Sequence, residues 1–182
     1  MKKISTLFLK DPCDLSHVST ELDINNAWAF ILGVPTRKFD GTACMIKDGQ
    51  LYKRYDCKNG KIPPNGAIPC QDPDPTTGHW PHWVACNRND ANDKLHWEAY
   101  DNQKPLEDGT YELVGPKINR NKDGFERHCL VKHGSEIIDH NFYEYNDIKE
   151  FLGKTMIEGI VFHNPETGEM CKIRRKDFGF KW

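Results

Sequence analysis

An Asp-Gly pair between two strand-like segments is the feature of this sequence that most restricts its fold. The segments are Thr42–Ile46 and Gln50–Tyr55, with Asp48-Gly49 between them. Asp-Gly suits the tight turns of β-hairpins, because both central residues of such a turn adopt positive φ. The sequence therefore predicts an antiparallel hairpin here. Along its second strand, the alternation of side chains places Arg54 and Lys53 on opposite faces.

The rest of the chain predicts short strands, two helices and long polar connections. Further strands are expected over residues 4–10, 110–114, 128–133, 156–162 and 170–176. One helix is expected over residues 91–101, and a second ends at Leu152, with Asn146 or Asp147 as its N-cap and Gly153 as its stop. Residues 13–25 are expected to be irregular, and residues 56–81 to form a long functional loop or cover.

Length and composition favour a single domain without a membrane partner. The 182 residues are 29% charged and 37% hydrophobic, and no apolar run is long enough to span a bilayer. Seven scattered cysteines without any Cys-x-x-Cys pair indicate reduced thiols in a cytoplasmic, intracellular protein. The formal net charge is −2, so any binding of nucleic acid would depend on local basic patches.

The segment Lys38–Gly41 follows an apolar run from Ala27 to Val34. Pro35 and Thr36 interrupt that run, so we expect Lys38 on a turn between two buried segments. A lysine is a nucleophile only after it loses its proton, which desolvation or nearby cations favour. Asp40 can position a sugar hydroxyl or the lysine, and Gly41 lets the backbone approach a ligand closely. Taken alone, Lys-x-Asp-Gly also fits a solvated charge beside a turn.

Charged residues in the later strands complement this lysine. Glu112 and Glu158 each lie among apolar residues, where a carboxylate needs a metal, a hydroxyl or a cation as partner. Lys172 and Arg174 share one face of the last strand, and Arg54 is suited to grip a phosphate. The set predicts phosphoryl transfer, in which the lysine attacks an α-phosphate, the cations neutralise the phosphates, and the glutamates bind ribose hydroxyls or a divalent metal.

These residues occur in the order of the motifs of covalent nucleotidyltransferases, and the chain resembles that superfamily of RNA ligases, DNA ligases and mRNA capping enzymes. Lys38–Gly41 looks like motif I, Arg54 like the arginine of motif Ia, Gly109–Gly115 like motif III, Glu158–Val161 like motif IV and Lys172–Arg174 like motif V. The tracts Gly-His-Trp-Pro, Gly-Pro-Lys-Ile-Asn and Lys-Ile-Arg-Arg-Lys-Asp-Phe-Gly are similar to a group of small RNA ligases that includes a vertebrate 5′–3′ RNA ligase.

The resemblance implies one adenylyltransferase domain of the α+β class over residues 1–182, with two antiparallel β-sheets flanked by helices and no C-terminal OB-fold. It implies ATP as a substrate and Mg²⁺ or Mn²⁺ as a cofactor. Lys38 would take AMP in a phosphoramidate bond, the AMP would pass to an RNA 5′-phosphate, and a 3′-hydroxyl would displace it and seal the strand. The expected protein is a monomer that repairs RNA with 5′-phosphate and 3′-hydroxyl ends.

The resemblance also assigns the site residues by position. The expected catalytic residues are Lys38, Lys172 and Arg174. The expected nucleotide-binding residues are Thr36, Lys38, Asp40, Gly41, Arg54, Glu112, Glu158, Lys172 and Arg174. The expected metal ligands are Glu112 and Glu158. Motif V commonly has a second lysine where this chain has Arg174, and Lys176 could share that role. The residue that stacks on adenine stays open among the strand at 128–133, Phe142 and Tyr143.

Other interpretations fit parts of the sequence. The motifs also suit a DNA ligase, an adenylyltransferase with another acceptor, or a nucleotide- or nucleic-acid-binding module that has lost the chemistry. A zinc-binding module would use His79, His82 and Cys86, although their spacing matches no standard zinc pattern. Trp80 or Trp83 could stack on a base. Packing of these aromatic side chains onto the protein body is favoured over a metal site.

Overall fold

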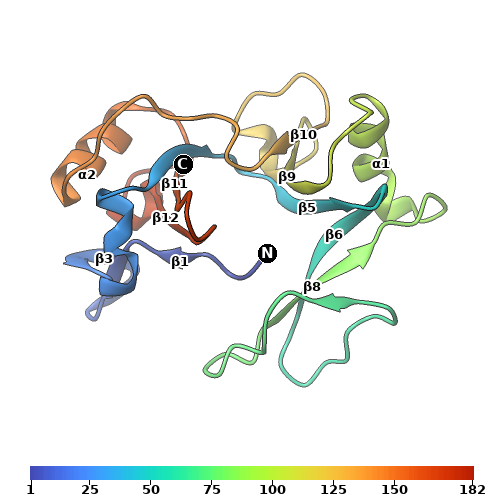
Figure 1. Ribbon diagram of the computed structural model, residues 1–182, viewed down its shortest axis with the longest axis horizontal. Coiled ribbons are helices and arrows are strands. Elements are labelled where there is room, and N and C mark those ends of the chain that lie inside the picture. Colours follow the sequence, from blue (N-terminus) through green and yellow to red (C-terminus); the bar gives the residue numbers. More distant parts are fainter. The chain divides into compact units, whose positions relative to one another are not determined.

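The computed structural model describes all residues from 1 to 182, and the chain divides into two compact units (Figure 1). The first unit comprises Met1–Lys3 and Asp40–His133, and the second comprises Ile4–Phe39 and Gly134–Trp182. Strands and helices are mixed in both units, so the α+β class is confirmed. The single nucleotidyltransferase domain over residues 1–182 stays a prediction.

The first unit is built on a six-stranded antiparallel sheet with the order β10-β9-β5-β6-β8-β7. Its strands are β5 (Thr42–Lys47), β6 (Gln50–Cys57), β7 (Ile68–Pro69), β8 (Trp80–Ala85), β9 (Gly109–Val114) and β10 (Cys129–Lys132). The predicted hairpin is confirmed, because Lys47 pairs with Gln50 across a two-residue turn. Asp48 and Gly49 adopt φ values of 51° and 73° in that turn, as a type I′ hairpin requires.

One face of this sheet packs against the helix α1 (Lys94–Asp101), which continues a 3₁₀ turn, η2 (Ala91–Asp93). The buried residues of this core are Cys44, Ile46, Leu51, Cys86, Ala99, Tyr111, Leu113 and Leu130. Those that lie in strands, Cys44, Ile46, Leu51, Tyr111, Leu113 and Leu130, come from alternate positions, since successive side chains of a strand point to opposite faces. The opposite face therefore carries Met45, Tyr52, Arg54 and Glu112, in agreement with the alternation in the sequence.

The second unit contains a four-stranded sheet with the order β1-β12-β11-β4 and a two-stranded sheet of β2 with β3. The strands are β1 (Ser5–Thr6), β2 (Phe8–Asp11), β3 (Asp14–Leu22), β4 (Val34–Lys38), β11 (Gly159–His163) and β12 (Met170–Arg174). The pairing of β1 with β12 is parallel, and the other pairings in this unit are antiparallel. The expectation of two antiparallel sheets is thus wrong in detail, because there are three sheets and one contains a parallel pair.

Two segments near the N-terminus differ from the prediction. The expected irregular segment 13–25 contains the nine-residue strand β3, because its antiparallel pairing with β2 supplies hydrogen bonds that its polar sequence does not suggest. The expected strand over 4–10 is divided between β1 and β2, which belong to different sheets. The apolar run after β3 begins within a 3₁₀ helix, η1 (Ile24–Phe30).

The core of the second unit lies between the four-stranded sheet and the helix α2 (Tyr145–Lys154). Its buried residues are Leu7, Phe8, Val18, Ala29, Phe142, Ile148, Leu152, Ile160, Phe162, Cys171 and Ile173. The N-cap of α2 is Glu144, and Asp147 completes a capping box from the third helical position, so the predicted caps Asn146 and Asp147 were wrong. Gly153 lies inside the helix and does not end it.

Lys38 is the last residue of β4 and does not lie on a separate turn, so that prediction was wrong. Pro35 was expected to interrupt regular structure, but β4 is the edge strand of its sheet, where a proline is tolerated. Backbone contacts cover this edge, since the N–H of Arg37 donates to Glu136 and that of Ile138 donates to Pro35. The lysine is therefore positioned by a strand that is bonded on both sides.

Two expectations concern the cysteines and the membrane. All seven cysteines are free thiols, and Cys44, Cys57, Cys86 and Cys171 are buried. None of the helices combines the length and the apolar character that a membrane crossing needs.

The approach of β11 to β12 depends on Gly159. A Cβ atom there would lie 2.2 Å from the Ile173 carbonyl oxygen and 2.8 Å from Arg174 Cα. We therefore expect Gly159→Ala to destabilise the protein by about 2 kcal/mol and to lower Tm by about 4–8 °C in thermal unfolding followed by circular dichroism.

Gly153→Ala is the matched control for this experiment. A Cβ at Gly153 would meet the Phe180 ring at 3.4 Å, which is an ordinary contact. Because alanine is the better helix former, the control is expected to be at least as stable as the wild type. An equal loss of stability in both variants would contradict the close approach as the cause.

Candidate active site

The pleat of the four-stranded sheet gathers the expected cations of the second unit on one face. Gly159 pairs with Lys38 on one side and with Arg174 on the other. Two residues further along β11, Val161 pairs with Thr36 and with Lys172. Directly paired residues project to the same side of a sheet, so all three cations share the face opposite the apolar core. No side chain stands between Lys38 and Arg174, because the residue between them is glycine.

Lys38 and Glu158, expected from motifs I and IV, form an ion pair. The distance from Lys38 Nζ to Glu158 Oε2 is 2.5 Å, and Nζ also donates to the Phe39 carbonyl at 3.2 Å. The side chains are 21% and 13% exposed, so the pair is only partly screened by solvent. A carboxylate within hydrogen-bond distance of a lysine is placed to accept the proton that the lysine must lose before it can act as a nucleophile.

Lys172 lies in an electropositive, desolvated setting. Its pKa is lowered to about 8, first by burial and then by the positive charges of Arg174 and Lys38. The charge of Glu158 acts in the opposite direction. The charge of Lys172 therefore changes within the range of pH at which enzymes work.

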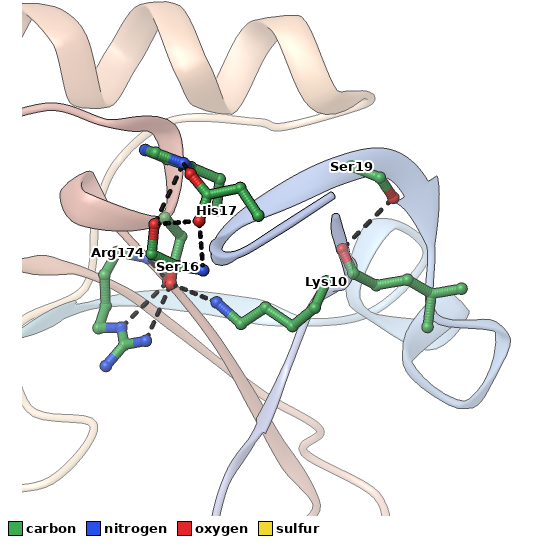
Figure 2. A network of polar contacts seen from close by, with 8 residues as sticks. Lys10, Ser16, His17, Ser19 and Arg174 are labelled. Carbon is green, nitrogen blue, oxygen red and sulfur yellow. Dashed lines mark hydrogen bonds and ion pairs between the residues drawn. The ribbon is translucent and has the colours of Figure 1, made fainter. Parts of the chain in front are cut away.

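Arg174 is held by Asp177, a residue that the sequence analysis did not single out. The Arg174 guanidinium donates from Nε and Nη2 to the two carboxylate oxygens, at 3.0 and 2.9 Å. Lys10 Nζ donates to the same carboxylate at 2.9 Å (Figure 2). Asp177 is fully buried and lies three residues after the arginine, in the 3₁₀ helix η4 (Arg175–Phe178). In the sequence, the only indication of this ion pair is that Asp177 follows Arg174 of motif V by three residues.

Thr36 was expected to bind the nucleotide, and its side chain lies inside the protein. It is 2% exposed, and its hydroxyl donates to the Val161 carbonyl at 3.1 Å. His163 Nε2 is 3.0 Å from the Thr36 hydroxyl oxygen. These contacts fix β4 against β11. Thr36 thus contributes to the position of the strand that carries Lys38.

In the first unit, Glu112 pairs with His133, which the sequence analysis considered only as the end of a strand. His133 Nε2 is 2.8 Å from Glu112 Oε2. The two groups meet because β9 and β10 are antiparallel neighbours and Glu112 lies opposite Val131. The part-buried Glu112 carboxylate therefore has a partner within the protein, the imidazole of His133.

Asp40 and Gly41 are held by a loop that contains the 3₁₀ turn η3 (Asn119–Asn121). The Asn119 side-chain amide donates to Asp40 Oδ1 at 3.0 Å and to the Gly41 carbonyl at 2.8 Å. Asp123 accepts from the Asp40 backbone N–H at 2.8 Å. Asn119 has a φ of 44°, in the left-handed region that asparagine tolerates better than most residues. This asparagine is a candidate site residue that was not singled out from the sequence, although it lies in the Gly-Pro-Lys-Ile-Asn tract.

Gly41 permits a close approach, but the neighbour is protein backbone. A Cβ at this position would lie 2.3 Å from the Leu113 carbonyl and 2.6 Å from Glu112 Cγ.

Arg54, the expected phosphate-binding arginine, contacts Asp56 through Nε at 3.0 Å and the Met1 carbonyl through Nη1 at 2.6 Å. The guanidinium of Arg54 is thus already hydrogen-bonded within the first unit.

The structure limits the alternatives for base stacking. Trp83 is 3% exposed and Phe142 is buried in the core of its unit, so neither ring is open to a base. Trp80 donates its indole N–H to the Gln71 carbonyl, and Tyr143 is 72% exposed. The strand β10 offers Val131 on the face that carries Glu112.

The zinc alternative is not supported by the placement of its residues. Buried His82 contacts the Trp80 carbonyl through Nδ1. Cys86 lies instead near Asp93 and His96, and the ligand atoms of these three residues are within 4.8 Å of one another. The Lys53 ammonium group is 2.5 Å from Asp93, so a cation already pairs with the only carboxylate of this cluster.

Each of the two expected metal ligands, Glu112 and Glu158, has the chemistry of a ligand for Mg²⁺. Glu112 and Glu158 are carboxylates on part-exposed side chains, and they contact His133 and Lys38 respectively. Mg²⁺ prefers carboxylate oxygens and is commonly held by one or two of them together with substrate phosphates. The donor type and the partial exposure of both glutamates therefore suit such an ion.

Comparison with known proteins agrees with this chemistry. A search of curated proteins finds no match. The sequence pattern of the family described as RNA ligase 1 matches residues 87–182, more than half of the chain. The matched segment contains Glu112, Glu158, Lys172 and Arg174, and it begins after Lys38. The chain belongs to the RNA ligase 1 family and is an enzyme of the ligase class.

Proposed function

We propose that the protein is an ATP-dependent RNA ligase that joins 5′-phosphate and 3′-hydroxyl ends through a lysyl-AMP intermediate. The observation that carries this proposal is that Gly159 of β11 pairs with Lys38 on one side and with Arg174 on the other. Glu158 forms an ion pair with the lysine, and Lys172 lies on the same face of the sheet. Family membership supports the choice of RNA over the DNA-ligase alternative. The repair of broken RNA by a monomer with an adenylyltransferase fold is part of the proposal.

In the first step, Lys38 attacks the α-phosphorus of ATP. Glu158 accepts the lysine proton, the new bond is N–P, and the bond between the α-phosphorus and the bridging oxygen of pyrophosphate breaks. Negative charge grows on the departing pyrophosphate, and Lys172 and Arg174 are the cations that offset it. Because both are fixed on a sheet before ATP binds, little reorganisation is needed as the charge develops.

In the second step, an oxygen of the RNA 5′-phosphate attacks the phosphorus of lysyl-AMP. The N–P bond breaks, the Lys38 nitrogen regains a proton, and the RNA now carries AMP through a pyrophosphate linkage. In the third step the 3′-hydroxyl attacks the RNA 5′-phosphorus, AMP leaves, and a phosphodiester forms. The same cations stabilise the phosphate charge in each step.

A divalent cation, Mg²⁺ or Mn²⁺, would neutralise phosphate charge and orient the phosphates. In the second unit its ligand would be Glu158, and in the first unit it would be Glu112. Glu112 could alternatively accept a hydrogen bond from a ribose hydroxyl. In the second unit, Thr36 is proposed to support nucleotide binding through the position of β4. In the first unit, Asp40, Gly41 and Arg54 are proposed as nucleotide-binding residues, Arg54 through a phosphate contact.

The lysine is tested by label transfer. Purified protein is incubated with α-labelled ATP or GTP and Mg²⁺ or Mn²⁺, and the products are separated on a denaturing gel. We expect ATP to label the wild type and Lys38→Ala or Lys38→Arg to reduce labelling to background, because neither variant has an amine that can lose its proton.

Lys47→Ala is the control for this test, since Lys47 is an exposed lysine at the end of a strand, outside the proposed site. It is expected to label like the wild type. Full labelling of the Lys38 variants would remove Lys38 as the nucleophile. Absence of label in the wild type with both nucleotides and both metals would instead favour a binding module without chemistry.

The pH dependence of labelling tests Lys172. Its pKa is lowered to about 8, so its positive charge is present below that pH and is lost as the pH rises through it. The second-order rate constant for lysyl-AMP formation should therefore fall above about pH 8. In Lys172→Arg the guanidinium stays charged, so the fall should move above about pH 10. The same fall in both proteins would assign it to another group.

The acceptor is tested by competition between substrates. A nicked RNA duplex, a nicked DNA duplex of the same sequence and a single-stranded RNA with both reactive ends are offered to the labelled enzyme. We expect the RNA substrates to be sealed at least about tenfold faster, in line with 2′-hydroxyl recognition. Preferential sealing of the DNA nick would support the DNA-ligase alternative.

A further inference from the structure

A cavity of about 520 Å³ opens beside the last strand of the second unit. It is lined by Lys10, Ser16, Arg174, Lys176, Phe180 and Lys181, and Leu15 adds an apolar side chain. Its size is in the range of pockets that hold a nucleotide-sized ligand. Most of these residues have no role in the mechanism above.

The charge in this cavity is strongly positive. Four of its lining side chains are cations and none is an acid. Lys10 and Arg174 both reach the buried Asp177 carboxylate, which holds them in place and offsets one positive charge (Figure 2). The nearby Asp14 carboxylate, which accepts from Ser16 and contacts His17, offsets another. The balance of four cations against two carboxylates leaves an excess of about two positive charges.

The wall that carries the two remaining lysines is anchored. The buried Arg175 donates to the Lys181 carbonyl at 3.0 Å and also to the carbonyls of Leu152 and Thr155. Lys176 lies in η4, next to Arg175, and its side chain is exposed. The backbone is fixed while both ammonium groups stay available to a ligand, so this is a defined basic surface.

We propose that this cavity binds the 5′-phosphorylated end of the RNA strand, an inference that rests on the proposed function. A terminal phosphate carries between one and a half and two negative charges near neutral pH, whereas an internal phosphodiester carries about one. The excess positive charge matches the terminal group. The Phe180 ring and the Leu15 side chain provide an apolar wall for the ribose or base of the first nucleotide.

The location of the cavity suits the second step of the reaction. Arg174 lines the cavity and lies in the same row as Lys38, with only Gly159 between them. A phosphate bound against Arg174 is therefore on the side of the sheet that carries the nucleophilic lysine. Lys10, Lys176 and Lys181 thereby become specificity residues for the 5′-phosphate.

The test is a comparison of two RNAs that differ only in their 5′ end. Fluorescence anisotropy measures the Kd of a 3′-labelled oligonucleotide with a 5′-phosphate and of the same oligonucleotide with a 5′-hydroxyl, without ATP. The wild type is expected to bind the phosphorylated RNA at least about tenfold tighter, and Lys176→Ala/Lys181→Ala should reduce this preference to less than about threefold.

Lys149→Ala/Lys154→Ala is the matched control. It removes two exposed lysines from α2 and changes the net charge by the same amount, outside the cavity lining. The control should keep the full preference for the 5′-phosphate. A wild type without this preference, or equal losses in both double variants, would overturn the inference.

A second readout separates the RNA end from the triphosphate of ATP. If the cavity bound ATP phosphates instead, the cavity variant would raise the ATP concentration for half-maximal labelling and would keep its RNA preference, and the inference would be wrong. Because the binding assay contains no ATP, it also gives a result if lysyl-AMP does not form. Failure of labelling with an intact 5′-phosphate preference would refute the proposed function and leave the RNA-end site standing.

Discussion

The pairing of β11 with β4 and β12 through Gly159 is the constraint on which the second unit depends. A glycine lets the β12 backbone come closer than any other residue would, since a single methyl group would overlap the Ile173 carbonyl. The same residue aligns Lys38 with Arg174 and leaves the space between them open. One backbone contact thus sets both the packing of the sheet and the spacing of the cations that are proposed to act on phosphates.

Three cations on one sheet face repel one another, and the protein offsets this cost with two acids. Glu158 pairs with Lys38, and the buried Asp177 pairs with Arg174 and Lys10. The pKa of Lys172 is lowered by desolvation and by the remaining repulsion from Arg174 and Lys38. A phosphate ligand would relieve that repulsion. The electrostatic repulsion among the three cations therefore favours the binding of an anion to this face.

The first unit fixes its own candidate residues by different means. Asn119 holds Asp40 and Gly41 from a loop in which Asn119, Arg120 and Asn121 all have positive φ. Residues in the left-handed region cost free energy and persist where surrounding contacts compensate, which is common at functional sites. The side-chain amide that bridges Asp40 and Gly41 is such a contact. The Glu112–His133 pair is secured instead by the regular register of β9 and β10.

The features that depend on local geometry could be predicted from the sequence alone. They are the Asp48-Gly49 hairpin, the faces of Arg54 and Lys53, and the shared face of Lys172 and Arg174, because turn chemistry and the alternation of a strand involve neighbouring residues only. The features that depend on residues far apart in the chain required the tertiary structure. Folding places Lys38 at the end of β4, makes residues 14–22 a strand and buries Thr36. It also brings Asp177 to Arg174, His133 to Glu112 and Asn119 to Asp40. Strand pairing and burial join distant segments, and no local pattern specifies which of them will meet.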